Sequence, residues 1–378
     1  MTARFIEIES RELLRSLKIA IDATDQRGLK ILRCVCISAD GMCATLSASD
    51  IESEVTLDLA VTGGKVAEPW TVCVPAKTLR RIARALAPAE IRIAAREEGE
   101  AVEIASIDRS VVFSIETEDY KNWPFAFANR PRLDLIEAFG NGLFADLLGK
   151  VAWCMSSEDT RYYLNGVAWQ IDSAGRRLVA CDGHQLAECR YSPEPAETAV
   201  TRIIRRNAVR FVCDHFKGRD IEVFRCGSDA IEIAAAGVSY RTRLIDGTYV
   251  DYQRVIPNDD AIKYRFTGID RPAMLRALTA VEALAPKVRN DTTALRFAPT
   301  SGKLTLGYSN PLVGSVVQPT GVEWPPEAAP FGFNFRYIRN VVTNCDGEIT
   351  LAITDPGAPF VFRDSDPTMT RVVMPMRV

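Results

Sequence analysis

The segment "CDGHQ" holds residue types that nucleophilic catalysis uses. Cys181 could act as a nucleophile, with His184 three residues later as its base. A base must lie within hydrogen-bond reach of its nucleophile, and two side chains in one short turn need not face each other. Asp182 has a simpler interpretation as an Asx-turn residue, because Asp50 in "ASDIE" and Asn310 in "YSNPL" stand in matching turns. The segment therefore favours a turn over a hydrolase site.

A second segment, "GNGLFA" (140–145), fits the glycine pattern of a dinucleotide-binding turn. Glu158 and Asp159 follow at a distance that would suit a ribose contact. The chain lacks the long alternation of parallel strands and helices that a dinucleotide fold needs. Corresponding helices near Arg11 and Arg271 also lack the glycines. These facts argue against a dehydrogenase.

Metal and disulfide chemistry are not expected. His184 and His215 are the only histidines, and the ten cysteines include no CxxC pair. Cys34 and Cys36 alternate along an apolar run, which is typical of small core residues on one face of a strand. We expect all the cysteines to be reduced in a cytoplasmic chain, and we predict no metal and no cofactor.

Length and composition indicate a folded protein with more than one domain. The chain has 378 residues, of which 47% are hydrophobic and 25% charged, and its net charge is −3. No apolar run is long enough to span a bilayer. The first residues, "MTARFIEIESRELL", carry charges where a signal peptide has an apolar stretch, so we expect a cytoplasmic location.

The chain repeats itself at the scale of a domain. Helix-like segments begin near Arg11, Asn141 and Arg271, so successive copies are 130 residues apart. A second helix recurs in each copy, and alternating strand-like runs follow it. The second helices begin near Val74, Ile204 and Phe333. This pattern predicts three α+β domains, 1–128, 129–257 and 258–378.

The repeated helices share a basic face. In 75–87 an apolar stripe at helical spacing lies opposite several basic residues, and the segment has no acidic residue. Charged residues also solvate exposed helix faces in many proteins, but one sign recurring at equivalent positions in an acidic chain suits contact with phosphates. No aromatic or amide cluster is present to read bases, so binding should be non-specific. The candidates are Arg15, Lys77, Arg80, Arg81, Arg84, Tyr163, Arg206, Arg210 and Lys217.

Four segments resemble the bacterial sliding clamp, the beta subunit of DNA polymerase III. They are "RYYLNGV" (161–167), "CDGHQLA" (181–187), "DGTYVDYQRVIP" (246–257) and the terminal "VVMPMRV". The resemblance implies three tandem clamp domains, and two chains joined head to tail into a ring with helices inside and sheets outside. It also implies a nucleoid-associated, non-catalytic processivity factor. Its partners would be duplex DNA, the polymerase III alpha subunit, the clamp loader delta subunit and other proteins with clamp-binding motifs.

The resemblance also implies a cleft between the second and third domains that binds short peptides. An apolar groove with a few polar rim groups is suited to that task. The chain departs from the family's usual residues at Cys181, Gln185, Val250 and Val378. The matching cleft positions are Leu164, Gly183, His184, Leu186, Arg254, Val255, Val373, Met374, Pro375, Met376 and Arg377.

The dimer contact implied by the resemblance involves three apolar residues. Phe113 and Ile115 lie in "VVFSIE" of the first domain, and Leu284 lies on the opposite side of the contact in the third. A DNA-binding module that does not encircle its target remains an alternative. Such a module would bind linear and circular DNA alike.

Overall fold

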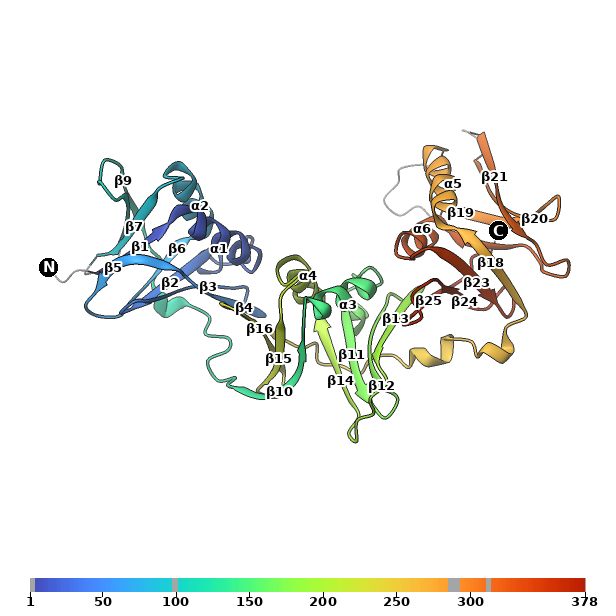
Figure 1. Ribbon diagram of the computed structural model, residues 1–378, viewed down its shortest axis with the longest axis horizontal. Coiled ribbons are helices and arrows are strands. Elements are labelled where there is room, and N and C mark those ends of the chain that lie inside the picture. The colour runs from blue at the N-terminus through green and yellow to red at the C-terminus, as the bar shows by residue number, and fades with distance from the viewer. Residues whose placement is uncertain (1–3, 97–100, 285–292, 311–313, 378) are drawn as a thin grey trace. The chain divides into compact units, whose positions relative to one another are not determined.

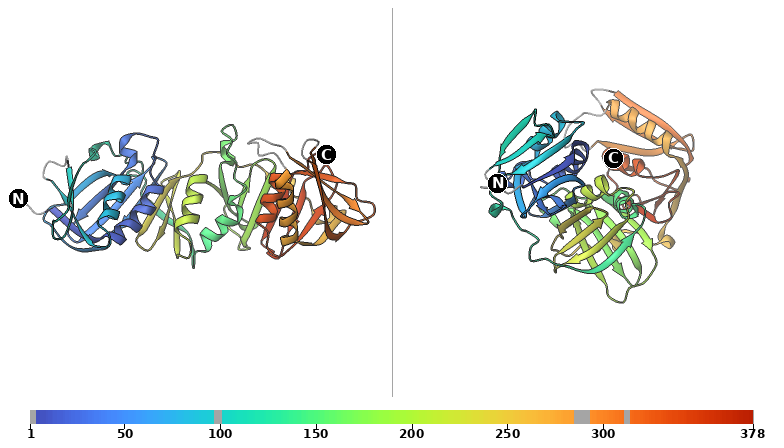
Figure 2. Two further views of the ribbon diagram at one scale, coloured as in Figure 1. Left: turned by 90° about the horizontal axis from the view of Figure 1, so that it is seen from above. Right: turned by 60° about the vertical axis from the view of Figure 1, so that its left-hand side comes forward.

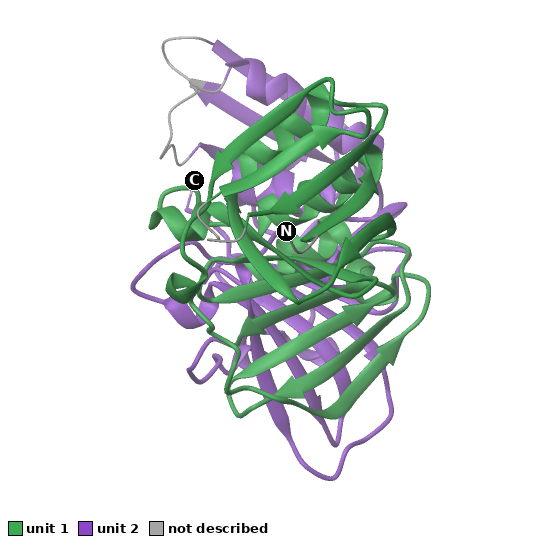
Figure 3. Ribbon diagram, turned by 90° about the vertical axis from the view of Figure 1, so that its left-hand side faces the viewer, with its two compact units in different colours: residues 1–146, 207–244 green, residues 147–206, 245–378 purple. Residues whose placement is uncertain are grey.

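The computed structural model (Figure 1) describes residues 4–96, 101–284, 293–310 and 314–377. It divides into two compact units: unit 1 contains 1–146 and 207–244, and unit 2 contains 147–206 and 245–378 (Figure 3). Each unit holds one outer repeat and a part of the middle repeat. The domain limits near 128 and 257 remain a prediction, while the mixed α and β composition and the three repeats are confirmed.

Each repeat has the two helices that the sequence predicts. In unit 1, α1 and α2 pack side by side, and α5 and α6 do so in unit 2 (Figures 1 and 2). None of the helices in the described ranges is long and apolar enough to cross a membrane. The helices are α1 Ser10–Asp22, α2 Ala76–Ala85, α3 Leu143–Ala152, α4 Arg206–His215, α5 Arg271–Leu284 and α6 Phe335–Thr343. Short 3-10 turns are η1 Lys30–Arg33, η2 Tyr120–Asn122, η3 Tyr162–Leu164, η4 Tyr252–Val255 and η5 Asp259–Ala261.

Amphipathic sequence explains how the helices attach to their sheets. In α2, Leu79, Ile82 and Ala83 are buried, while the basic residues between them face outward. In α1, Leu13 and Leu17 are fully buried. The apolar stripe of each helix therefore fixes which of its faces stays in solvent.

Unit 1 contains two antiparallel sheets. One has five strands in the order β5-β1-β7-β8-β9, and the other has eight in the order β10-β15-β16-β17-β4-β3-β2-β6. The strands from the first repeat are β1 Arg4–Glu9, β2 Cys34–Asp40, β3 Cys43–Ser49, β4 Ser53–Asp58, β5 Val61–Val66, β6 Trp70–Pro75, β7 Glu90–Ala95, β8 Ala101–Ser106 and β9 Val112–Glu116. Those from the middle repeat are β10 Arg132–Phe139, β15 Ile221–Cys226, β16 Ala230–Ala235 and β17 Val238–Arg243.

Unit 2 repeats this plan. Its eight-stranded sheet has the order β14-β11-β12-β13-β25-β24-β23-β18, and its four-stranded sheet has the order β21-β20-β19-β22. The strands from the middle repeat are β11 Gly166–Asp172, β12 Gly175–Cys181, β13 Gln185–Ser192 and β14 Val200–Arg205. Those from the third repeat are β18 Tyr264–Asp270, β19 Ala294–Thr300, β20 Lys303–Asn310, β21 Gly314–Glu323, β22 Phe331–Asn334, β23 Glu348–Ile353, β24 Phe360–Arg363 and β25 Met369–Val373.

Within each unit, one strand pair joins two repeats. In unit 1 the last strand of the middle repeat, β17, pairs with β4 of the first repeat. In unit 2 the last strand of the third repeat, β25, pairs with β13 of the middle repeat. The same antiparallel joint is thus built twice, and it turns two smaller sheets into one continuous ladder of backbone hydrogen bonds.

The cysteine prediction was wrong at one pair. Cys36 of β2 and Cys73 of β6 lie directly opposite each other in the ladder and form a disulfide. Cys34 and Cys36 are both buried, as the alternating pattern predicted. The sequence offered no sign of the bond, because the partners are separated by 37 residues and meet only through strand pairing.

We predict that the denatured protein will show eight alkylatable thiols without reductant and ten after reduction, because eight of the ten cysteines are free. Mass spectrometry of the alkylated protein measures this directly. The Cys73→Ser variant should show nine thiols with or without reductant and should lose about 2–4 kcal/mol of stability. Ten thiols without reductant would contradict the disulfide.

Candidate functional site

A cavity of about 230 Å³ in unit 2 lies where the connector between the middle and third repeats crosses the joint strands. Four of the segments that the sequence singled out contribute to it. Its apolar lining comes from four elements: η3, β13, the connector and the end of the chain. The lining residues are Arg161, Tyr163, Leu164, Cys181, Gly183, His184, Gln185, Leu186, Val250, Asp251, Tyr252, Val255, Val372 and Met374.

Strand alternation decides which terminal residue faces the cavity. Val372 pairs with Leu186, and both belong to the apolar cluster around the cavity. Val373 points to the other face of β25, where it is fully buried in the core of the third repeat. We predicted Val373 as a cleft residue, and the structure places Val372 there instead.

The chain end is held by its backbone. The N–H of Met374 donates to the carbonyl of His184 (2.9 Å), and the N–H of Met376 donates to that of Gly332 (2.7 Å). Met374 lines the cavity and is 36% exposed. Pro375 and Met376 are partly buried away from the lining, and Arg377 is exposed. The end of the chain is therefore part of the fold as far as Met376.

The turn "CDGHQ" is organised by Asp182. One carboxylate oxygen accepts from the backbone N–H groups of His184 and Gln185 (both 2.8 Å), and the other accepts from the Gln185 side chain (2.8 Å). Gly183 has a φ of 92°, a region that favours glycine, and the Arg161 guanidinium packs against it. The predicted Asx turn is confirmed here. It is also confirmed at Asp50, which accepts from the N–H of Ser53 (2.6 Å).

The geometry does not support a Cys181–His184 catalytic pair. Burial raises the pKa of the Cys181 thiol, so the reactive thiolate is disfavoured. The His184 ring stacks on Tyr337, with ring centroids 5.4 Å apart. Among the described residues, no group of three or more His, Cys, Asp or Glu side chains is placed to hold a metal ion.

A buried polar network, which the sequence did not reveal, fixes the connector. Tyr252 receives a hydrogen bond from Arg177 Nε (2.9 Å), and its hydroxyl donates to Glu188 (2.9 Å). Burial and the nearby Glu188 charge raise the pKa of Tyr252 far above its usual value, so the phenol stays protonated and can donate. Arg177 also pairs with Asp172 (2.5 Å). These bonds anchor the connector to β12 and β13 beside the cavity.

Ion pairs occupy the rim. Arg161 pairs with Glu158 (2.7 Å), and its hydrogen bond lowers the pKa of that carboxyl. Arg254 is highly exposed and pairs with Asp251 (2.6 Å). Val255 lies beside them at the surface and lines the cavity. The cavity therefore combines an interior of aliphatic and aromatic side chains with a charged edge.

Most of the predicted DNA contacts lie on exposed helix faces. In unit 1, Lys77, Arg81, Arg84, Arg210 and Lys217 are exposed and Arg80 is partly buried. None of these six forms an ion pair with another described residue of unit 1. Arg15 is exposed and lies near Glu12 (3.4 Å).

Two of the predicted DNA contacts are placed differently. Tyr163 lines the cavity in unit 2. Arg206, also in unit 2, donates to the carbonyl of Met155 (2.9 Å) and is partly buried. These two side chains are engaged within the fold, so they are weaker candidates than the exposed lysines and arginines.

The predicted dimer residues lie on an edge strand and at the end of a helix. Phe113 is partly buried and Ile115 is buried on β9, the edge strand of the five-stranded sheet. Leu284 is partly buried at the last residue of α5. Val378 and the side chain of Asn310 lie outside the described part of the chain.

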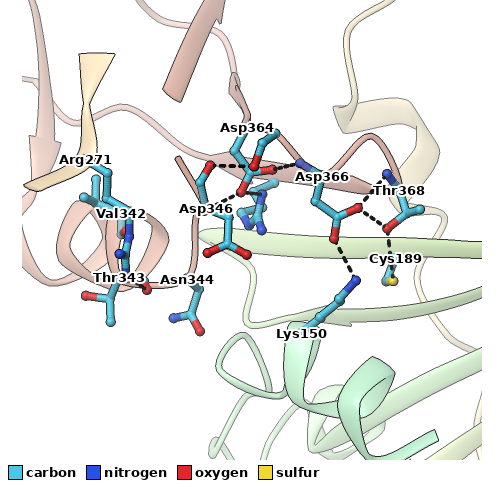
Figure 4. Close-up of polar contacts among 12 residues, drawn as sticks. Lys150, Cys189, Arg271, Val342, Thr343, Asn344, Asp346, Asp364, Asp366 and Thr368 are labelled. Atoms are coloured by element: carbon cyan, nitrogen blue, oxygen red, sulfur yellow. Dashed lines mark hydrogen bonds and ion pairs between the residues drawn. The ribbon is translucent and has the colours of Figure 1, made fainter. Parts of the chain in front are cut away.

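A polar cluster lies beside β25, the strand that contributes Val372 to the cavity lining (Figure 4). Asp366 accepts hydrogen bonds from Lys150 Nζ of α3 (2.7 Å) and from the backbone and hydroxyl of Thr368 (3.0 and 2.6 Å). Arg371 pairs with Asp364 (3.0 Å), and both side chains are almost fully buried. The cluster thus links the middle repeat to the loop that leads into β25.

Comparison with known proteins agrees with this architecture. The sequence model of the DNA polymerase III beta subunit N-terminal domain matches residues 4–126, and that of its central domain matches residues 140–251. The chain belongs to the DNA polymerase III beta subunit family. This clamp is 26% identical to the Caulobacter vibrioides beta sliding clamp over 99% of its own length and 100% of that protein. It is 24% identical to the Pseudomonas aeruginosa beta sliding clamp, covering 98% and 99% of the two chains.

Solved clamp structures share the fold of this clamp over its whole length. The Bartonella birtlesii sliding clamp bound to griselimycin has a TM-score of 0.86 at 26% identity, with 100% of both chains covered. The C. crescentus clamp, with polyethylene glycol bound at a putative beta-motif tethering region, has a TM-score of 0.87 at 25% identity, covering 100% and 99%. The resemblance predicted from the four segments is therefore confirmed, and the chain is a non-catalytic processivity factor.

The Asp366 contacts should make the clamp sensitive to acid. Burial opposes ionisation, but hydrogen bonds from Lys150 and Thr368 prevail and lower the pKa of Asp366 to about 2. The unfolded value is about 3.9. Since the folded pKa is the lower one, this stabilisation is complete above about pH 4 and is lost as the pH falls towards 2.

We expect the unfolding free energy of Asp366→Asn to fall less steeply than that of the wild type between pH 5 and pH 3 in urea titrations. The loss at neutral pH should be about 1 kcal/mol, because Lys150 is 40% exposed. Asp134→Asn, at a highly exposed carboxylate, is the control and should follow the wild type. Parallel curves for Asp366→Asn and wild type would contradict the assignment.

Proposed function

We propose that two copies of this clamp join head to tail into a ring around duplex DNA, and that the cavity beside β25 binds peptide motifs of replication proteins. The strand pairing supports the ring most directly. The last strand of a repeat, β17 or β25, pairs with β4 or β13 of the repeat before it. In the first and third repeats, the equivalent strands are β9 and β21, and each lies at the edge of its sheet.

The two edge strands correspond to strands that pair with each other at the internal joints: β9 to β17 and β25, and β21 to β4 and β13. An unpaired edge strand presents backbone donors and acceptors that readily pair with another chain. If β9 of one copy pairs with β21 of the other, the internal joint is reproduced between subunits. Phe113 and Ile115 on β9 would then lie at the contact, with Leu284 on the other side. Two such contacts per dimer close a ring.

The exposed cations support binding to the DNA backbone. Lys77, Arg81, Arg84, Arg210 and Lys217 lie on α2, on α4 and in the residues that follow α4, and they belong to an acidic protein. Such side chains can contact phosphates irrespective of sequence. Held in a ring, they would allow the clamp to slide.

We predict that Arg84→Ala will flatten the dependence of log K on log salt by about one unit, and to the same extent for two unrelated duplexes. Fluorescence anisotropy at low salt measures this. Arg225→Ala, at an arginine of β15 that pairs with Asp134 (2.7 Å), is the matched control and should leave the slope unchanged. A loss of affinity that depends on the DNA sequence would contradict non-specific contact through the phosphates. In a separate experiment, equal retention of the clamp on circular and linear DNA would favour a module that does not encircle its target.

The cavity supports a peptide-binding role. Leu164, Leu186, Val255, Val372 and Met374 give it aliphatic walls suited to apolar anchor residues. Cys181, Gln185 and Val250, where the chain departs from the family's usual residues, also line it. We propose that the polymerase III alpha subunit, the clamp loader delta subunit and other proteins with clamp-binding motifs dock here, in the nucleoid.

We predict that a fluorescent peptide with a Gln-Leu-x-Leu-Phe motif will bind the intact clamp and that Met374→Ala will weaken binding by about fivefold to thirtyfold. Met374 lines the cavity, whereas Met376 does not. Met376→Ala is therefore the matched control and should bind like the wild type. If both variants bind equally well, or if Met376→Ala is the weaker, the peptide does not occupy this cavity.

A further inference from the structure

A second cavity of about 230 Å³ lies in unit 1, at the other joint between repeats. The connector from the first to the middle repeat crosses the joint strands β4 and β17 there, as the later connector crosses β13 and β25 in unit 2. The cavity has the same volume as the candidate cleft. The repeat has therefore built two similar cavities, and their linings can be compared.

The unit 1 cavity is lined by four aromatic side chains and by no leucine, valine, isoleucine or methionine, whereas the cleft combines aliphatic side chains with Tyr163, His184 and Tyr252. Tyr120, Trp123, Phe125 and Phe127 all come from the connector. Trp123 and Phe127 are buried, but Tyr120 and Phe125 are 39% and 43% exposed. The exposed rings meet edge to face, with centroids 5.1 Å apart. The entrance to this cavity therefore presents two π systems to solvent.

The backbone is strained at one of the two exposed aromatic residues. Phe125 has a φ of 44°, in the left-handed region that bulky residues rarely adopt. Such a conformation persists only where the surroundings enforce it, and it is concentrated at functional positions. At Phe125 the strained conformation accompanies an aromatic side chain that is partly exposed to solvent.

A carboxylate inside the cavity has an attractive charge near it but forms no close ion pair with a described residue. Glu54 of β4 lies near Trp123 in the lining, and burial raises the pKa of its carboxyl, against the opposing effects of Trp123 and of the Arg241 charge. Arg241 lies opposite Glu54 in the ladder but pairs with Glu232 (3.0 Å). Arg130, the other arginine of the lining, pairs with Asp229 through both carboxylate oxygens (2.8 Å each). No ion pair in the described part of the chain includes Glu54.

We propose that this cavity is a second binding site, which accepts a lysine or arginine side chain of a partner protein alongside the exposed rings of Tyr120 and Phe125, with its charge against Glu54. Aromatic faces attract a cation within about 6 Å, and a carboxylate adds a charge-assisted hydrogen bond. The cationic group of such a ligand would form an ion pair with the Glu54 carboxylate in the lining. The two joints of the clamp would then select different residues, apolar side chains in unit 2 and a basic side chain in unit 1.

The test uses the full chain labelled with 5-fluorotryptophan, in which the chain's five tryptophans give separate fluorine signals. The Trp123→Phe variant identifies the signal of Trp123. Titration with N-acetyl-lysine methylamide should shift this signal to saturation. The uncharged analogue N-acetyl-norleucine methylamide should not shift it, and added salt should weaken the binding of the lysine compound.

Glu54→Gln keeps the size and polarity of the side chain but removes the charge, and it should raise the apparent Kd for the lysine compound at least about tenfold. Asp251→Asn, which changes a carboxylate of the other cavity, is the matched control and should bind as the wild type does. If Glu54→Gln is not folded by circular dichroism, Phe125→Ala replaces it with the same expected loss. The proposal is overturned if neither compound shifts the signal, if both shift it equally, or if the variant that removes Glu54 or Phe125 binds normally.

Discussion

The structure depends on one constraint: the last strand of a repeat must find its hydrogen-bonding partners in another repeat. Buried backbone groups have to be paired, and β17 and β25 satisfy this need on β4 and β13. Three copies of a unit therefore share sheets across the boundaries between neighbouring repeats. The same requirement leaves β9 and β21 at the sheet edges, so the geometry that joins repeats also specifies how a second copy could attach.

The joints explain where the cavities lie. At each joint the connector has to cross the shared sheet, and its aromatic residues hold it there: Tyr249 and Tyr252 in unit 2, and Trp123 in unit 1. Side chains of the joint strands then line the space beside the connector. The two cavities have one architectural origin, and their chemistry depends on a few side chains that the repeat leaves free to vary.

The sequence predicted the elements better than the contacts between them. Helical periodicity located the six α-helices of the described residues, since their apolar stripes are local features of the chain. Motif resemblance pointed to residues that line the unit 2 cavity, because Leu164, Leu186 and Met374 belong to segments that could be recognised directly. Strand register could not be read from the sequence, and register decides that Val372 rather than Val373 faces the cavity, and that Cys36 meets Cys73. The network of Arg177, Glu188 and Tyr252 was missed for the same reason, because its members converge only in three dimensions.

The strand that lines the cleft is also the strand that joins the middle and third repeats. Val372 contacts the cavity while its backbone pairs with Leu186 across the joint. Ligand binding in the cavity and the stability of the joint are therefore thermodynamically linked, because a ligand that binds only the folded joint stabilises it by mass action. At a free concentration one hundred times its Kd, such a ligand adds about 2.7 kcal/mol. A compound that occupies this cavity would therefore strengthen the joint between the middle and third repeats and would not separate them.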